Sequence, residues 1–156
     1  MSLSFLCKNH RAWLNQHPDD AIQNCVSNRE AARVLYQQRH WHEALLYIGS
    51  AFESAEILLN NRIIMQDSAM EWFLHTLAGL IQTLKALSHV DACKKFYQAG
   101  IDQLKQERIN TPDIKKAIDA QICRLSQERA QLDVNAKLDI RRVQPLVNNQ
   151  HAMVLH

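Results

Sequence analysis

Apolar residues recur every three or four positions along most of the chain, which is the spacing of one face of an α-helix. The pattern is clearest over residues 41–61, where each step along the apolar stripe is three or four residues or a doublet. Small residues in the same segment would let a neighbouring helix approach closely. The stripe consists of Trp41, Ala44, Leu45, Ile48, Ala51, Phe52, Ala55, Leu58 and Leu59.

Polar residues that favour helix N-termini stand at the breaks in this pattern. We expect Asp19 or Asp20 to cap one helix and Asp67 or Ser68 to cap another. Thr111 precedes a proline, which indicates one more helix start. The helices expected from the periodicity cover residues 3–16, 19–38, 41–61, 68–88, 93–107 and 112–132.

The periodicity also indicates how the chain is organised. Residues 1–18 are expected to form a short N-terminal helix or arm, and residues 19–133 a helical domain with short links that favour antiparallel neighbours. After Asp133 the pattern fades, so residues 134–156 are predicted to be a C-terminal tail. The segment 68–88 is apolar on nearly all sides, which favours burial at the centre or between subunits.

Composition strengthens the helical prediction. The chain has 156 residues but only three glycines and three prolines, against roughly 11 and 8 at average usage. A β-sandwich or a fold with phosphate-binding loops needs more glycine for its turns. Apolar residues make up 47% of the chain, too many for a disordered segment. The predicted fold class is therefore all-α, with antiparallel hairpins of about five to six helices.

Charge and segment composition limit the classes of partner. The formal net charge is +2, from 18 basic and 16 acidic residues, so no dense basic stripe for nucleic acid is expected. No apolar run is long enough to span a membrane, and the first residues lack the layout of a signal peptide. We therefore expect a cytoplasmic protein without a nucleic-acid or membrane partner.

Recognisable catalytic and metal-binding motifs do not occur in the sequence, so we predict neither an enzyme nor a cofactor or metal site. His40 and His42 flank Trp41, but residues two apart on a helix point in different directions. The four cysteines form no CxxC pair. Cys93 and Cys123 fall on apolar stripes and are expected to be small buried residues.

Residues 32–51 resemble a tetratricopeptide repeat (TPR). A small residue and a large apolar one precede a polar link, an aromatic residue opens the next helix, and small residues follow at helical spacing. These places are filled by Ala32, Leu35, Trp41, Ala44, Ile48 and Ala51. Arg39 stands where the family usually has a glycine. The resemblance implies a right-handed array of helical hairpins.

A second, weaker copy can be laid on the same template further along the chain. Its offset from the first is 93 − 44 = 49 residues, from Ala44 to Cys93, whereas a regular TPR repeats about every 34 residues. Longer helices, or an arrangement that is only TPR-like, would account for the difference. The alternative is a generic helical bundle. The copy comprises Leu77, Leu80, Ile81, Leu84, Val90, Cys93, Tyr97 and Gly100.

The resemblance implies a concave groove lined by the first helix of each hairpin. Arg29 and Arg33 are four apart and share a face, so two guanidiniums beside Tyr36 could grip a carboxylate. The alternative is a solvated face that pairs with Glu30 or Glu43. The residues that the resemblance places in the groove are Arg29, Arg33, Tyr36, His75, Gln82 and Lys85.

These observations favour a protein-interaction module, a TPR-like adaptor or chaperone-type protein that binds an acidic or C-terminal peptide segment of a partner. The second hypothesis is a structural or regulatory homo-oligomer, such as a homodimer, with the segment 68–88 at the subunit interface. The third is an enzyme with a helical active site, which would require a polar pocket with a perturbed carboxylate or histidine.

Overall fold

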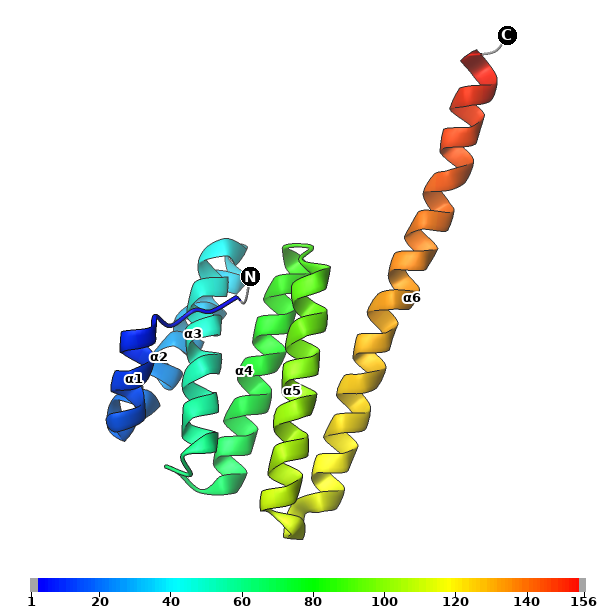
Figure 1. The fold of residues 1–156 in the computed structure, drawn as a ribbon. Coiled ribbons are helices and arrows are strands. Elements are labelled where there is room, and N and C mark those ends of the chain that lie inside the picture. The colour runs from blue at the N-terminus through cyan, green and yellow to red at the C-terminus, as the bar shows by residue number, and fades with distance from the viewer. Residues whose placement is uncertain (1–2, 155–156) are drawn as a thin grey trace. The chain divides into compact units, whose positions relative to one another are not determined.

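The computed structural model describes the backbone of residues 3–154 and the side-chain surroundings of residues 3–139. Over these residues it contains six α-helices, one short 3₁₀ turn and no strand (Figure 1), which confirms the all-α prediction. The helices are α1 (Lys8–Gln16), α2 (Pro18–Gln37), α3 (Trp41–Asn60), α4 (Gln66–Ala86), α5 (Val90–Asn110) and α6 (Lys115–Val154), with the 3₁₀ turn η1 (Pro112–Ile114) before α6. None of these helices combines the length and apolar run needed to cross a bilayer.

The chain divides into two compact units, Met1–Phe96 and Tyr97–His156, so that α5 begins in one and continues in the other. The sequence-based boundaries, with residues 19–133 as one helical domain, stay a prediction. Periodicity shows which side of a helix is apolar but not which neighbour covers it, so it could not locate this division.

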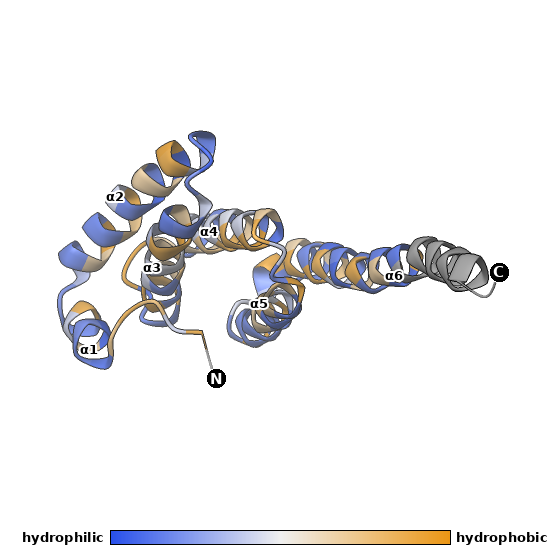
Figure 2. Ribbon diagram, turned by 90° about the horizontal axis from the view of Figure 1, so that it is seen from above, coloured by the Kyte–Doolittle hydropathy of each residue, from blue (hydrophilic) through white to orange (hydrophobic). Residues whose placement is uncertain are grey.

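Small residues on α3 allow close packing at the centre of the first unit. α3 contacts both α2 and α4 and lies between them in the end-on view (Figure 2). Ala44, Ala51 and Ala55 are fully buried, as expected for positions where helices approach closely. α2 contributes Ala21, Cys25 and Ala32 to this core, and α4 contributes Ala69, Met70, Phe73, Leu77, Leu80, Ile81 and Leu84.

A polar seam also joins α2 to α3. The Asn24 side-chain amide donates to the hydroxyls of Ser50, at 3.1 Å, and Ser54, at 2.6 Å. Asn28 donates to the same Ser50 oxygen at 3.0 Å. Because these hydrogen bonds require one alignment of the two helices, the seam fixes their register.

Helices α2, α3 and α4 end in the same way. Each is followed by a non-glycine residue in the left-handed region, with φ of 61° at Arg39, 52° at Arg62 and 59° at Ser88. The next backbone N–H then donates back into the helix, as His40 does to the Leu35 carbonyl at 2.9 Å. These are Schellman motifs. They satisfy the last carbonyls and reverse the chain within a few residues, so consecutive helices run antiparallel.

Helices α2, α4 and α5 begin one to three residues earlier than predicted, α5 at Val90 rather than at residue 93. α2 begins at Pro18, so Asp19 and Asp20 lie in its first turn rather than at the cap. Proline fits this position because the first N–H groups of a helix have no intrahelical partner. α4 begins at Gln66, which likewise places Asp67 inside the first turn. Carboxylates there still interact favourably with the positive end of the helix dipole.

In the second unit, α6 lies against the later part of α5. The Tyr97 hydroxyl donates to Glu128 at 3.1 Å, and Arg108 pairs with Asp119 at 2.8 Å. Thr111 does not cap α6 as predicted. Its hydroxyl instead donates back to the Glu107 carbonyl at 2.7 Å.

Two further expectations differ from the structure of α6. Its backbone stays helical through residues 134–154, which the sequence had assigned to a tail, while residues 155–156 lie outside the described part of the chain. Cys123 is exposed rather than buried, whereas Cys93 is buried as expected. A position on an apolar stripe is buried only if a neighbouring element covers it, and spacing alone does not specify that neighbour.

Candidate functional site

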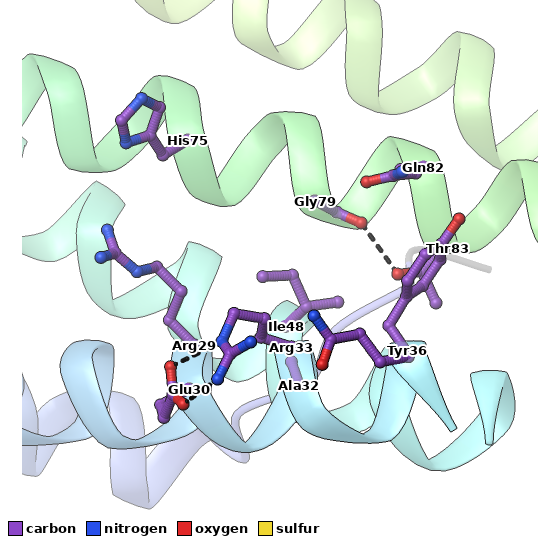
Figure 3. Close-up of a pocket in the computed structure, with 11 residues that line it drawn as sticks. Arg29, Glu30, Ala32, Arg33, Tyr36, Ile48, His75, Gly79, Gln82 and Thr83 are labelled. Atoms are coloured by element: carbon purple, nitrogen blue, oxygen red, sulfur yellow. Dashed lines mark hydrogen bonds and ion pairs between the residues drawn. The ribbon is translucent and has the colours of Figure 1, made fainter. Parts of the chain in front are cut away.

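A groove between α2 and α4 forms a cavity of about 520 Å³ in the first unit (Figure 3). α2 forms one wall and α4 the other, and α3 contributes to the floor. The residues that line the cavity are Arg29, Glu30, Ala32, Arg33, Tyr36, Gln37, Ile48, His75, Gly79, Gln82 and Thr83.

The structure brings together five of the six residues that the sequence had placed in a groove: Arg29, Arg33, Tyr36, His75 and Gln82. Lys85 does not line the cavity, because it lies in the last turn of α4, beyond the cavity wall. The remaining lining residues were not predicted from the sequence. Helical spacing could have found some of them, since Ala32 and Gly79 lie three or four positions from predicted members.

The positive charges on the α2 wall differ in their surroundings. Arg33 makes a bidentate contact with Glu30, from Nε to Oε2 at 3.0 Å and from the terminal nitrogen to Oε1 at 2.6 Å. This hydrogen bonding and charge lower the pKa of Glu30. Both side chains are exposed, so the pair adds little stability. Its main effect is to hold the Arg33 guanidinium against its own helix.

Arg29 is the charge that faces the groove. Among the described residues it has no hydrogen-bond or ion-pair partner, and its side chain extends from α2 toward α4 on the side where His75 lies (Figure 3). An Arg guanidinium and an imidazole on opposite walls provide hydrogen-bond donors for one anionic group. This end of the groove therefore suits a carboxylate.

The floor of the groove is apolar and tightly built. A Cβ added at Gly79 would lie 3.0 Å from the Ile48 Cδ1 atom, so the glycine lets α4 approach α3 closely. Ile48 and Ala32 are both buried. At the far end, Tyr36 extends toward Thr83 of α4 (Figure 3). The floor offers a shallow apolar surface for a side chain next to the charged end.

Metal-ligand geometry is not found in the part of the chain that the structure describes, where no three His, Cys, Asp or Glu side chains come together. At the start of α3, the His40 ring lies 4.0 Å from the Glu43 carboxylate, a distance too long for a hydrogen bond. Arg29, His75 and the apolar floor are suited to holding a ligand by charge and contact.

Comparison of the chain with protein-family models, with curated proteins and with solved structures finds no match.

Proposed function

We propose that this chain is a protein-interaction module that holds an acidic segment of a partner polypeptide in the groove between α2 and α4. The observation that carries the proposal is that Arg29 and His75 lie on opposite walls, at the same end of a cavity with an apolar floor. Its volume of about 520 Å³ lies within the range of roughly 300–1,000 Å³ seen for ligand pockets.

Each part of the groove has a role in this proposal. The Arg29 guanidinium binds a carboxylate of the partner, and His75 donates a second hydrogen bond to it when the ring is suitably protonated. Ile48 contacts an adjacent apolar side chain. Tyr36 offers an aromatic face and a hydroxyl at the far end. Because Arg33 is engaged by Glu30, it contributes general positive charge rather than a direct contact.

We also propose that the helices form a long-helix variant of the TPR-like arrangement. α3 begins at Trp41 and α5 at Val90, an offset of 90 − 41 = 49 residues. α2 and α4 begin at Pro18 and Gln66, an offset of 66 − 18 = 48 residues. A regular TPR repeats about every 34 residues. Helices of 20 and 21 residues account for the longer repeat.

The homo-oligomer hypothesis rested on the apolar excess of the segment 68–88. In α4 the large apolar side chains are buried or half-buried within the single chain. A large apolar side chain is exposed just before the start of the helix, where Met65 is 78% exposed. We therefore propose no second subunit on α4, and the homo-oligomer hypothesis stays a prediction from the sequence.

The proposal is tested by fluorescence anisotropy with an acidic heptapeptide of alternating Glu and Leu. Arg29→Glu should weaken binding at least about tenfold, because a charge-assisted hydrogen bond is replaced by repulsion. Lys85→Glu is the matched control, since it changes the net charge equally on a residue outside the cavity. Equal losses in the two variants, or no binding by the unmodified chain, would refute the groove as the site.

A second peptide distinguishes an internal acidic side chain from a C-terminal carboxylate. The same heptapeptide with an amidated C-terminus loses only its terminal charge. If affinity is unchanged, the groove binds acidic side chains. If affinity falls at least about tenfold, it binds a chain end.

A further inference from the structure

Residues 3–7, here called the strap, run without regular secondary structure from the start of α1 across α3 and bend at Phe5 and Leu6 (Figures 1 and 2). The sequence had predicted helix from residue 3, but α1 begins only at Lys8. The cause is a tertiary contact: the backbone of the strap is bound by a side chain of α3.

That side chain is Glu53, a buried carboxylate that accepts hydrogen bonds from three successive residues. The Leu6 N–H donates to Oε2 at 2.6 Å and the Phe5 N–H to Oε1 at 3.1 Å. The Ser4 hydroxyl also donates to Oε1, at 3.2 Å. Arg11 of α1 lies 3.3 Å from the same oxygen. A carboxylate that is only 5% exposed requires such donors, and the strap supplies most of them.

Gly49, one helical turn before Glu53, makes room for the Phe5 ring. A Cβ added at Gly49 would overlap the Phe5 ring, so no other residue fits there without displacing the ring. The ring also lies 6.1 Å from that of Phe96, which in turn meets Phe52 edge-on at 5.8 Å. We call Gly49, Phe52, Glu53 and Phe96 the seat.

The seat binds the strap as a binding site would bind a bent peptide segment. Glu53 accepts hydrogen bonds from two successive backbone N–H groups, which point the same way because the chain bends at Phe5 and Leu6, while Gly49 and the phenylalanines accept an aromatic side chain. Leu6 is buried, whereas Ser4 is exposed and Phe5 is half-buried. Ordering five residues costs conformational entropy that offsets part of these contacts, so the docked state is favoured by less than the contacts alone would give.

We propose that the seat is a second peptide-binding site, and that the strap is its displaceable intramolecular ligand. The partner that would replace the strap is a segment with a hydroxyl, an aromatic and an aliphatic residue in succession, bent at the last two of them as the strap is. This site uses Gly49 and Glu53 of α3, whereas α3 contributes only Ile48 to the groove. The proposal is therefore independent of the proposed function.

The test uses the full chain with the strap disabled by Phe5→Gly and Leu6→Gly together. A labelled peptide of residues 1–8 should bind this variant at least about tenfold more tightly than the unmodified chain, whose own strap competes at high effective concentration. Adding Gly49→Ala to the variant should abolish binding, as should Phe5→Ala in the peptide. A strap-disabled variant that keeps its helical circular dichroism but binds no peptide would overturn the proposal.

Hydrogen exchange in the unmodified chain decides the question if the variant does not fold. The Phe5 and Leu6 amides should exchange at least about tenfold faster than core amides of α3 such as that of Phe52, because the strap opens locally. Exchange of all three at the same rate would show that the strap is released only when the unit unfolds, and that the seat has no separate binding role.

Discussion

At the scale of single residues, two carboxylates on α3 share one cation. A terminal nitrogen of Arg11 lies 3.3 Å from Glu53 and 3.9 Å from Glu56. Burial raises the pKa of Glu56 from 4.5 to about 7; the Glu53 charge adds to this rise, and Arg11 opposes it. The folded chain therefore holds a proton on Glu56 at pH values where the unfolded chain has released it.

This difference makes stability depend on pH in a defined direction. Between about pH 4.5 and 7 the folded state binds more protons than the unfolded state, so the Glu56 contribution to stability falls as pH rises. Glu56→Gln should raise the free energy of unfolding at pH 8 by roughly 1–3 kcal/mol and leave it unchanged at pH 4. Urea unfolding at both pH values measures this, and an equal effect at the two would contradict it.

Glu53→Gln should lower the free energy of unfolding, the opposite of the effect expected at Glu56. Glu53→Gln keeps the size of the side chain but turns an amide toward strap N–H groups and loses the Arg11 ion pair. We expect the free energy of unfolding to fall by roughly 1–3 kcal/mol. Glu43→Gln, at an exposed site on the same helix, is the control and should change it by less than about 0.5 kcal/mol. Similar effects at both sites would show that the contacts of Glu53 with the strap and Arg11 do not stabilise the fold.

At the scale of elements, the turns between helices are built without glycine. Arg39, Arg62 and Ser88 occupy left-handed positions that favour glycine, while Gly49 and Gly79 lie inside helices where neighbours approach closely. These two glycines therefore serve close helix packing, while the turns contain non-glycine residues in a strained left-handed conformation. Hydrogen bonds back into each helix make the strained turns tolerable.

Arg39→Gly should therefore stabilise the α2–α3 hairpin. Relief of the left-handed strain exceeds the greater freedom of glycine in the unfolded chain, so we expect a gain of about 0.5–1 kcal/mol in the free energy of unfolding. Thermal and urea unfolding measure it. Arg39→Ala is the control, because it removes the same charge and keeps the strain. A gain as large with alanine as with glycine would show that charge, not backbone strain, is the cause.

Helices were predictable because their signal is local. The stripe that begins at Trp41 predicted residues 41–61, and α3 spans Trp41–Asn60. The strap was not predictable, since Leu6 is held by Glu53, which is 47 positions away and gives no local pattern. The predicted burial of Cys123 was wrong for a similar reason. The sequence shows the apolar stripe on which Cys123 lies, but it does not show that no neighbouring element covers this position.

At the scale of the whole molecule, the chain consists of two units, and the candidate groove belongs to the first. The TPR resemblance suggested that α2 and α4 face each other across a groove. Helical spacing then indicated which residues of each helix share the face in question, because residues three and four apart lie on the same side. It did not predict that Lys85 lies beyond the cavity or that Glu30 binds Arg33. Those outcomes depend on where the cavity ends and on side-chain conformation, which helical spacing does not specify.

The central claim is that the groove between α2 and α4 binds an acidic peptide. Amide chemical shifts of the ¹⁵N-labelled chain, titrated with the Glu–Leu heptapeptide, test it most directly. The account predicts saturable shifts concentrated at residues 29–37 of α2 and 75–83 of α4, with smaller ones at Ile48. Shifts concentrated on α6, or spread evenly over exposed basic residues, would contradict it.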